Sequence, residues 1–600
     1  MKTKHFLIGG LATLSLIMVS SCTDSSYDLD NVDTTARFKA NDLIVPINLD
    51  VLTFDQVLDL DENSEIVKMK DPNGRDIYAV KKEGTFNSSE INVDKITAHP
   101  SIGTTTAVLS QTGMLPSGFT AEFDIIGVAP TVFTANATDI DEAILRVDTL
   151  GVASTLTTTL TLSAPPGSGS IDWANAVTIK NLKIEFPAGI KCTTDKGTFI
   201  ETNPTMKDYS LLDLSSVNLK PNSSGKIEIT LNVTDYYTVT KSDNTKNIDF
   251  DPNAQTLSIS DQVKIQTGTI ELYNASASFP SSINFKIAPT MDDLVVNTFT
   301  GSVNYKVKDF DIDPIDLNNL PDFLNQEGTK LGLENPQIYL GLNNPVGNFQ
   351  NQKHDDYVYL QTDFVMTPER DGVVAAPCAL PAPFVIPGGT TAEQQFVMSP
   401  KNPSPNFYPG YGTPTFVSYP KLKDVLTETD GIPTKITVKA SPELPTQDVS
   451  KFTLGTDLGK VDGRYTFYAP LQLSNNTTIH YTDTLDGWND EDVDKLNITA
   501  LKLNMTVTTE VSFPIELTIV PTTFNSKPIP GVTANTVTLP AGAMDYPFEV
   551  VFHGEIAHLD GLLLKAKVVN GDDQTILGPT MKILMKNSKA TLTGYYEKEL

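Results

Sequence analysis

The sequence contains many acidic side chains, some of them at a spacing that could bind a metal ion. The chain has 73 Asp and Glu residues, and Asp309, Asp311 and Asp313 stand at alternate positions. In a strand this spacing places three carboxylates on one face, and calcium is bound by about six to eight oxygens of this kind. The loop glycine and closing glutamate of an EF-hand are missing, so the sequence leaves open a calcium site or a solvated acidic loop.

Histidine and nucleophile motifs give little support to catalysis. The chain has six histidines, and the pair His553 and His558 lacks the HExxH spacing of a zinc-binding helix. The sequence also lacks a G-x-S-x-G turn, a phosphate-binding loop and a dinucleotide fingerprint. We therefore expect a non-enzymatic protein without a cofactor. A hydrolase that uses two carboxylates from distant strands is the less favoured alternative, because such a pair leaves no sequence motif.

A segment rich in proline and aromatic residues, 402–420, is the most suggestive stretch for ligand binding. Its five candidate residues are Phe407, Tyr408, Tyr411, Phe416 and Tyr419. A rigid backbone with aromatic rings can present flat faces to a sugar ring or a peptide, or the rings can pack onto the sandwich of the protein itself. With only two tryptophans in the chain, stacking on glycans is less favoured than it would be otherwise.

The beginning of the chain has the pattern of an export signal. Lys2 and Lys4 precede an apolar run that ends at Val19, and small residues lead to Cys22. The run is too short for a membrane-spanning helix, which needs about 20 apolar residues, and it fits a secretory signal peptide. Residues 19–22 (VSSC) resemble a lipobox, which implies cleavage before Cys22 and lipid on its thiol. An ordinary secreted protein with an incidental cysteine is the alternative.

Charge and the remaining cysteines restrict the partners. The formal net charge is −29, which argues against nucleic acid and anionic lipid surfaces, since both attract basic patches. Cys192 and Cys378 are far apart in the sequence and lack the spacing of a zinc site. We expect two isolated buried thiols rather than a disulfide that joins separate modules.

The elements that must position these residues are strands. Apolar residues alternate with Thr, Lys or Asn over 155–162, 226–233, 435–439 and 503–511, the period of a sheet with one face in water. Four apolar-Pro pairs, ending at Pro116, Pro187, Pro280 and Pro514, each precede a strand pattern. Short helical turns are expected at 316–325, 420–428 and 490–496. The pattern predicts an all-β protein of several immunoglobulin-like β-sandwich modules in series.

The expected organisation is a signal peptide, a flexible acidic tether and four modules. The tether is polar and without periodicity, which is typical of a flexible linker. The predicted ranges are 1–21 for the signal, 22–39 for the tether, and 40–143, 144–290, 291–421 and 422–600 for the modules.

The first 100 residues or so resemble uncharacterised surface and outer-membrane lipoproteins of Bacteroidota. The resemblance rests on the Ser21-Cys22 junction, the acidic tether and the segment FKANDLIVPINLDVLTFDQVLDL that follows. It implies an outer-membrane lipid anchor and exposure on the cell surface, with the periplasmic face as the alternative. It also implies O-glycans on Thr149 and Thr484, whose Asp-Thr-Leu context matches the sequon of that phylum.

These observations favour a non-enzymatic envelope lipoprotein that acts as a structural or interaction scaffold. Its expected partners are the membrane, through the lipid, and other envelope proteins or a glycan. A glycan-binding accessory lipoprotein of a polysaccharide-uptake system is the main alternative, and a fimbrial subunit is a further one.

Overall fold

The prediction of an all-β protein is confirmed. The computed structural model describes residues 35–46, 51–58, 60, 64–116, 118–200, 211–240, 246–276, 278–317, 320–325, 328–344, 350–351, 358–388, 393–475, 477–488, 493–569 and 576–599. The predicted signal peptide, Cys22 and most of the tether lie outside these residues. Within them the helices are short turns, and none is long and apolar enough to cross a membrane.

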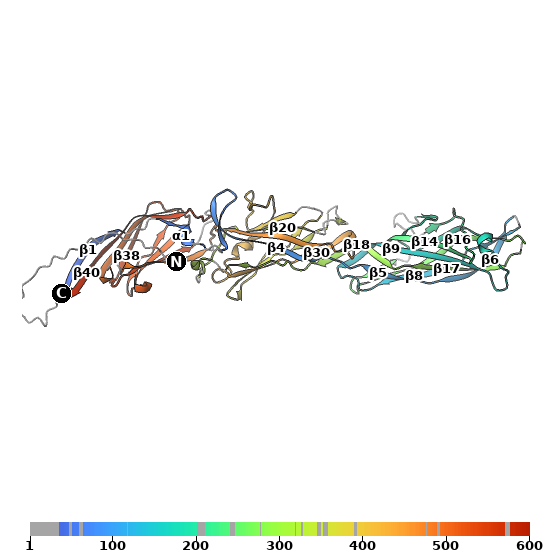
Figure 1. The fold of residues 1–600 in the computed structure, drawn as a ribbon, viewed down its shortest axis with the longest axis horizontal. Coiled ribbons are helices and arrows are strands. Elements are labelled where there is room, and N and C mark those ends of the chain that lie inside the picture. The colour runs from blue at the N-terminus through green and yellow to red at the C-terminus, as the bar shows by residue number, and fades with distance from the viewer. Residues whose placement is uncertain are drawn as a thin grey trace, which may run out of the picture.

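The molecule is elongated, with three β units along its long axis (Figure 1). We call them the terminal unit (35–58 and 477–599), the middle unit (64–93 and 308–475) and the distal unit (94–307), each range taken over its described residues. The terminal unit contains both the first and the last strand of the chain, which pair with each other. The chain therefore runs out to the distal unit and returns.

The terminal unit is a sandwich of two antiparallel sheets. One sheet has the order β1 (Thr35–Pro46), β40 (Lys582–Glu599), β33 (Leu496–Thr509), β38 (Tyr546–His553) and β36 (Thr533–Ala534), with β2 (Val51–Thr53) also on β40. The other has the order β32 (Thr478–Leu485), β39 (Gly561–Val569), β34 (Ile515–Thr523) and β35 (Lys527–Pro528), with β37 (Val537–Leu539) also on β34. Its short helices are α1 (Phe54–Leu58), η5 (Val493–Lys495) and η6 (Phe524–Ser526).

The middle unit also contains two sheets. One is β28 (Thr415–Ser418), β27 (Gln394–Ser399), β20 (Gln337–Leu342), β31 (Lys460–Pro470), β4 (Asp76–Glu90) and β3 (Ile66–Lys70). The other is β19 (Ile315–Asp316), β29 (Lys435–Lys439), β23 (Val365–Arg370) and β24 (Val373–Val374), with β25 (Cys378–Ala379) on β23. The helical turns are η2 (Asp322–Asn325) and η3 (Pro420–Asp424).

The distal unit is formed by consecutive strands, β5 to β18, and one helical turn, α2 (Trp173–Ala176). The strands are β5 (Ile96–Ile102), β6 (Thr105–Met114), β7 (Thr120–Asp124), β8 (Thr131–Ala137), β9 (Ile144–Ser163), β10 (Val177–Glu185), β11 (Ile190–Thr193), β12 (Thr198–Ile200), β13 (Leu211–Asp213), β14 (Lys226–Tyr237), β15 (Ile248–Asp251), β16 (Thr256–Tyr273), β17 (Ser282–Met291) and β18 (Leu294–Lys306). The alternating pattern of 155–162 and 226–233 becomes β9 and β14, which pair with each other.

Continuous hydrogen bonding joins the distal and middle units. β18 pairs with β30 (Pro442–Thr453), which also pairs with β21 (Gln350–Asn351) and β22 (Leu360–Thr362). β26 (Phe384–Ile386) extends this group through β22. A single cluster of buried apolar side chains also includes residues from all three units. The units are therefore linked by strands and by core, as well as by the chain itself.

The predicted module boundaries at 143, 290 and 421 do not coincide with the units. Residues 40–143 supply β1 and β2 to the terminal unit, β3 and β4 to the middle unit, and β5 to β8 to the distal unit. The physical reason is that a strand's pattern fixes its two faces but not its partner. The expected helical turns do occur, as η2, η3 and η5.

Candidate functional site

Four of the five predicted ligand-binding aromatics, all but Tyr419, lie on the outer face of the sheet that contains β4, β20, β27 and β31. There Tyr408 and Tyr411 form a second buried cluster with Tyr339 and Tyr468. The ring centroids of Tyr339 and Tyr411 are 4.9 Å apart, and those of Tyr408 and Tyr468 are 5.1 Å apart. Tyr408 is only 8% exposed and Tyr411 only 5%, so the sheet covers most of both rings.

Hydrogen bonds and one arginine fix this segment to the sheet. The backbone N–H of Tyr408 donates to the Tyr339 hydroxyl at 2.9 Å, and that hydroxyl donates to Gln337 Oε1 at 2.6 Å. Arg464 donates to both carboxylate oxygens of Glu393, at 2.9 and 3.0 Å, and its guanidinium lies 4.2 Å from the centroid of the Tyr411 ring. The hydrogen bonds from Arg464 hold the pKa of Glu393 below its usual range.

The other three predicted aromatics are divided between packing roles. Phe407 and Phe416 are half-buried against the same tyrosine cluster. Tyr419 is fully buried in the main core, and its hydroxyl donates to the carbonyl oxygen of Cys378. All five rings thus contact the protein's own sheets, and a ligand-binding role for them stays a prediction.

The remaining predicted site residues are dispersed. Asp309, Asp311 and Asp313 are exposed, and hydrogen bonds from Ser441 and Lys439 lower the pKa of Asp309. Within the described part of the chain, no three His, Cys, Asp or Glu side chains meet in a metal-binding arrangement. The predicted glycan carriers Thr149 in β9 and Thr484 in β32 are both half-buried, and their modification stays a prediction.

Cys192 and Cys378 are buried free thiols, as expected. Cys192 lies in β11 of the distal unit and Cys378 in β25 of the middle unit. Burial raises the pKa of Cys192 to about 12 and that of Cys378 to about 11. Both thiols are therefore protonated at neutral pH.

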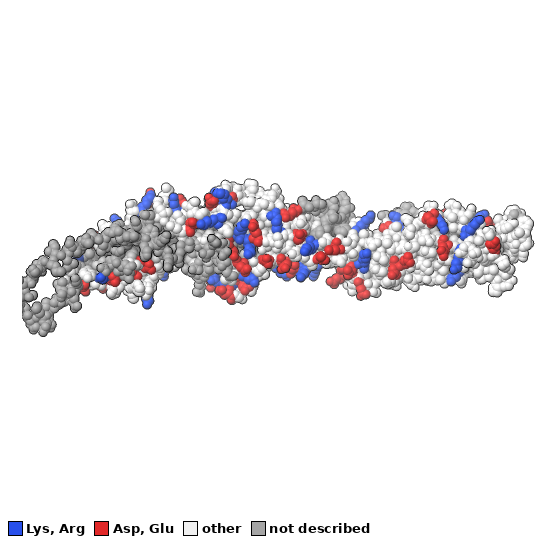
Figure 2. Space-filling view, viewed as in Figure 1, with Lys and Arg blue, Asp and Glu red and all other residues white. Residues whose placement is uncertain are grey.

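The far end of the distal unit carries almost no charge. Four connections meet there, because β6 leads into β7, β9 into β10, β13 into β14, and β16 into β17 at the same end of the paired strands. Their residues, 115–119, 164–172, 215–225 and 274–281, include only Asp172 and Lys220 as charged side chains. Figure 2 shows the outermost part of this end without Lys, Arg, Asp or Glu on the visible face. We call these four connections the distal tip.

Large apolar side chains are exposed beside the distal tip. Met114 at the end of β6 is 49% exposed, Phe119 before β7 is 45% exposed, and Tyr273 at the end of β16 is 52% exposed. They are neighbours in the sheet, since Tyr273 pairs with Thr120 and the N–H of Asn274 donates to the carbonyl oxygen of Phe119 at 2.9 Å. The tip thus combines uncharged polar loops with exposed apolar and aromatic groups.

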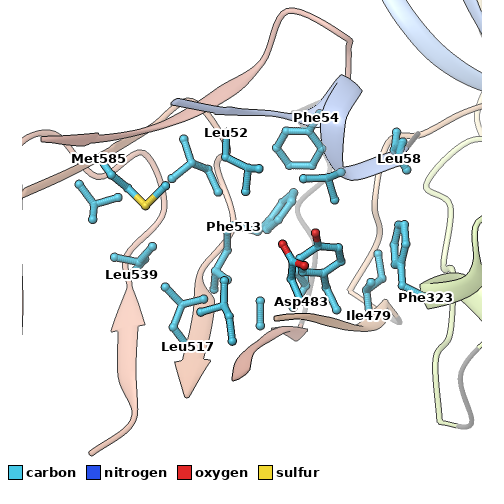
Figure 3. Close-up of a pocket in the computed structure, with 18 of the residues that line it drawn as sticks. Leu52, Phe54, Leu58, Phe323, Ile479, Asp483, Phe513, Leu517, Leu539 and Met585 are labelled. Atoms are coloured by element: carbon cyan, nitrogen blue, oxygen red, sulfur yellow. The ribbon is translucent and has the colours of Figure 1, made fainter. Parts of the chain in front are cut away.

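An apolar cavity lies between the two sheets of the terminal unit (Figure 3). Side chains alternate between the two faces of each strand, so every second residue faces the cavity. One sheet contributes Leu503, Met505 and Val507 of β33, and the other contributes Leu517 of β34 and Ala566 of β39. Figure 3 shows further lining side chains around the space, with Leu52 and Phe54 on one side and Leu517 and Leu539 on the opposite side.

The cavity is large enough to matter energetically. Its volume is about 240 Å³, and an unfilled apolar cavity costs on the order of 24 cal/mol per Å³, or about 6 kcal/mol here. This is comparable with the whole stability of a typical domain, about 5–15 kcal/mol. Inward-facing Leu517, Leu564 and Val568 are only half-buried, whereas Leu156 and Leu231 in the sandwich of the distal unit are fully buried.

Among the residues that the structure describes, only two polar side chains line this cavity, and both come from β32. Tyr481 and Asp483 point inward in the same register as Ile479 and Leu485. Burial, together with the neighbouring carboxylate of Asp483, raises the pKa of Tyr481 to about 12. The Phe323 ring of η2 packs edge-to-face on Tyr481, with centroids 5.6 Å apart. β32 is the edge strand of its sheet, and beyond it the lining continues with residues of the middle unit, among them Phe323 and Leu324 of η2.

Sequence reasoning missed both the cavity and the distal tip. The cavity had one local signal, an acid at Asp483 in the apolar register of a strand. The distal tip also had a local signal in the sequence. Its four connections consist mainly of Ser, Gly, Pro and Asn, although the chain as a whole is acidic.

Comparisons with known proteins give no family for this chain. No family model and no curated protein matches it. Among solved structures it is similar to a candidate secreted protein of Parabacteroides distasonis, with 16% identity over 49% of this chain and 89% of that chain and a TM-score of 0.34. It is also similar to infectious bursal disease virus, Gx strain, with 9% identity over 85% and 83% of the two chains and a TM-score of 0.13. At these TM-scores the similarities carry no argument about function.

Proposed function

We propose that this protein is a non-enzymatic, lipid-anchored envelope protein that holds an interaction surface away from the outer membrane. The observation that carries this proposal is the position of the chain's strands along the long axis (Figure 1). β1 pairs with β40 in the terminal unit, and the distal tip lies at the opposite end of the molecule. The first residues of β1, 35–39, belong to the range predicted as a flexible tether and form a strand instead. A chain held through Cys22 then presents its distal tip farthest from the anchor.

The chemistry of the distal tip suits contact with another envelope protein. Exposed aromatic and Met side chains are enriched at protein interfaces, while Lys, Glu and Asp are depleted there. Met114, Phe119 and Tyr273 supply such groups. The net charge of the chain is −29, but the loops of the distal tip are nearly uncharged, so an acidic partner would meet little electrostatic repulsion there.

Site-specific photo-crosslinking in the native host tests this proposal. A photoreactive amino acid in place of Phe119 or Tyr273 is expected to give crosslinked products of discrete mass. The same amino acid in place of Met544 is the matched control, because Met544 is an exposed apolar residue (83%) in the terminal unit. Equal crosslinking from Phe119 and Met544, or none from either tip position, would contradict the proposal.

The anchor is tested separately by Cys22→Ala. Loss of the thiol removes the atom that receives the lipid, so the variant is expected in the soluble fraction while the unchanged protein sediments with membranes. A variant that still sediments with membranes, and resists extraction by high salt, would overturn the anchoring.

Glycan binding is the second candidate function, favoured by the two exposed rings at the distal tip. On polysaccharide affinity gels, Phe119→Ala and Tyr273→Ala should then abolish retardation. Tyr408→Ala and Tyr411→Ala test the earlier prediction for segment 402–420. Unretarded migration of the unchanged protein on every polysaccharide would remove this candidate.

A further inference from the structure

The cavity of the terminal unit has the properties of a ligand site rather than of a packing defect. It is bounded by both sheets and by α1, so it is not a groove between neighbouring loops. On one side the two sheets are joined, since β37 contacts β38 and β36 contacts β34. On the other side its lining comes from edge strand β32, from β2 and from α1. The adjoining end of the middle unit completes this side with apolar residues only: Phe323, Leu324, Leu331, Leu471 and Leu473.

We propose that this cavity binds a single aliphatic chain that carries an uncharged or cationic polar head. The lining offers methyl, methylene and aromatic surface and, apart from Tyr481 and Asp483, no side-chain hydrogen-bonding group. A ligand that needed several hydrogen bonds, such as a sugar or a nucleotide, would lose them on entry. An aliphatic chain loses no hydrogen bonds on entry, and it supplies the van der Waals contacts that the lining side chains lack around the empty space.

The volume sets the length of chain that fits. An engineered apolar cavity of about 150 Å³ binds benzene, and 240 Å³ is larger than that. If one methylene takes the ~30 Å³ share of a water molecule, the cavity holds on the order of eight methylene groups. The head of the ligand would lie beside Tyr481 and Asp483, the polar residues of the lining.

Asp483 selects the head group. It is the one carboxylate among the lining residues, it stands on the edge strand, and its Oδ1 accepts from the N–H of Thr484 at 2.8 Å. A fatty-acid carboxylate placed beside it would add a like charge in an apolar setting. A hydroxyl can instead donate to Asp483, and an ammonium group can pair with it. The Tyr481 hydroxyl, two residues away on the same face of β32, already hydrogen-bonds the Asp483 carboxylate, and its oxygen can also accept from the head group.

Binding of three single-chain probes tests the proposal. 1-Dodecanol, below its aqueous solubility limit, and dodecylamine and dodecanoate, below their critical micelle concentrations, are titrated into the full chain carrying Cys22→Ala, by calorimetry and native mass spectrometry. The alcohol and the amine are expected to bind one molecule per chain, at least tenfold more tightly than dodecanoate. Asp483→Asn should raise the affinity for dodecanoate at least tenfold and lower that for dodecylamine.

Filling the cavity gives the matched comparison. Ala566→Trp projects an indole into the cavity from β39, whereas Lys567→Trp places the same side chain on the exposed outer face of that strand. The first variant should weaken 1-dodecanol binding at least tenfold and the second should leave it unchanged. Leu564→Phe is a milder filling variant should Ala566→Trp fail to fold. Equal affinities in the filled and outer-face variants, or no binding of any probe, would overturn the proposal.

Discussion

Tyr339 connects the proline-rich and aromatic segment to the middle unit through its hydroxyl. It accepts from the backbone N–H of Tyr408 and donates to Gln337, and all three groups are buried. Tyr339→Phe would leave a donor and an acceptor without partners, at a cost of about 1–3 kcal/mol. Chemical denaturation should show this loss in the free energy of unfolding. Tyr273→Phe at the exposed tip is the control and should change stability by less than about 0.5 kcal/mol; equal effects would contradict the role of Tyr339.

The two buried thiols give a prediction about pH. Burial raises the pKa of Cys192 to about 12 and that of Cys378 to about 11, so the folded state favours the protonated form. Their contribution to stability is complete below the ordinary thiol pKa of about 8.5 and is lost as the pH rises through 11 to 12. In the Cys22→Ala protein at pH 8, a thiol reagent should therefore react with no cysteine until denaturant is added. Rapid reaction of the native protein would contradict this.

At the scale of elements, β40 is the strand on which the terminal unit depends. It pairs with β1 on one side and with β33 on the other, and Leu592 in its centre is buried. Leu592→Pro removes a ladder hydrogen bond and leaves its partner carbonyl unsatisfied, at a cost of about 1–3 kcal/mol. Hydrogen exchange should show lost protection in the terminal unit and unchanged protection in β9 and β14. Leu592→Val keeps the N–H and is the control; lost protection throughout the chain would contradict separate stability of the units.

The strands themselves were predictable because their signals are local. Segments 226–233 and 435–439 become β14 and β29, and the strands β7, β11, β17 and β34 begin a few residues after the four apolar-Pro pairs. Proline cannot donate to a ladder and therefore suits such a start. Partners were not predictable in this way. β1 pairs with β40 across more than five hundred residues, and nothing within either strand encodes that choice.

The same distinction applies to the sites. Segment 402–420 was identified from its composition, but the burial of Tyr408 and Tyr411 depends on Tyr339 and Tyr468 from distant strands. The cavity is a space between two sheets. Its lining side chains are ordinary apolar core residues, so no sequence pattern distinguishes them from a fully packed core. The one local indication of the cavity was the inward-facing Asp483. A single acid in a strand pattern is too common, however, to predict a cavity.

For the whole molecule, the arrangement of three units along one axis predicts solution dimensions. A compact domain of 600 residues would have a radius of gyration of about 25 Å. Small-angle scattering of the Cys22→Ala protein should give a value well above that, with a pair-distance distribution skewed to long distances. A symmetric distribution with a radius near 25 Å would show that the units fold back on one another and would remove the proposed display of the distal tip.

The pairing of β1 with β40 has a consequence for the order of folding. In a chain exported from its N-terminus, as proposed above, β1 emerges long before β40, so the terminal unit cannot close its sheet until more than five hundred further residues have followed β1. The distal unit, whose strands β5 to β18 are consecutive, can fold as soon as it emerges, and the middle unit must wait for β31 to reach β4. Folding during such export proceeds from the distal unit back toward the terminal unit. A chain truncated before β40 would leave β1 and β33 without the strand that both pair with, and so with exposed edges that can pair with other chains.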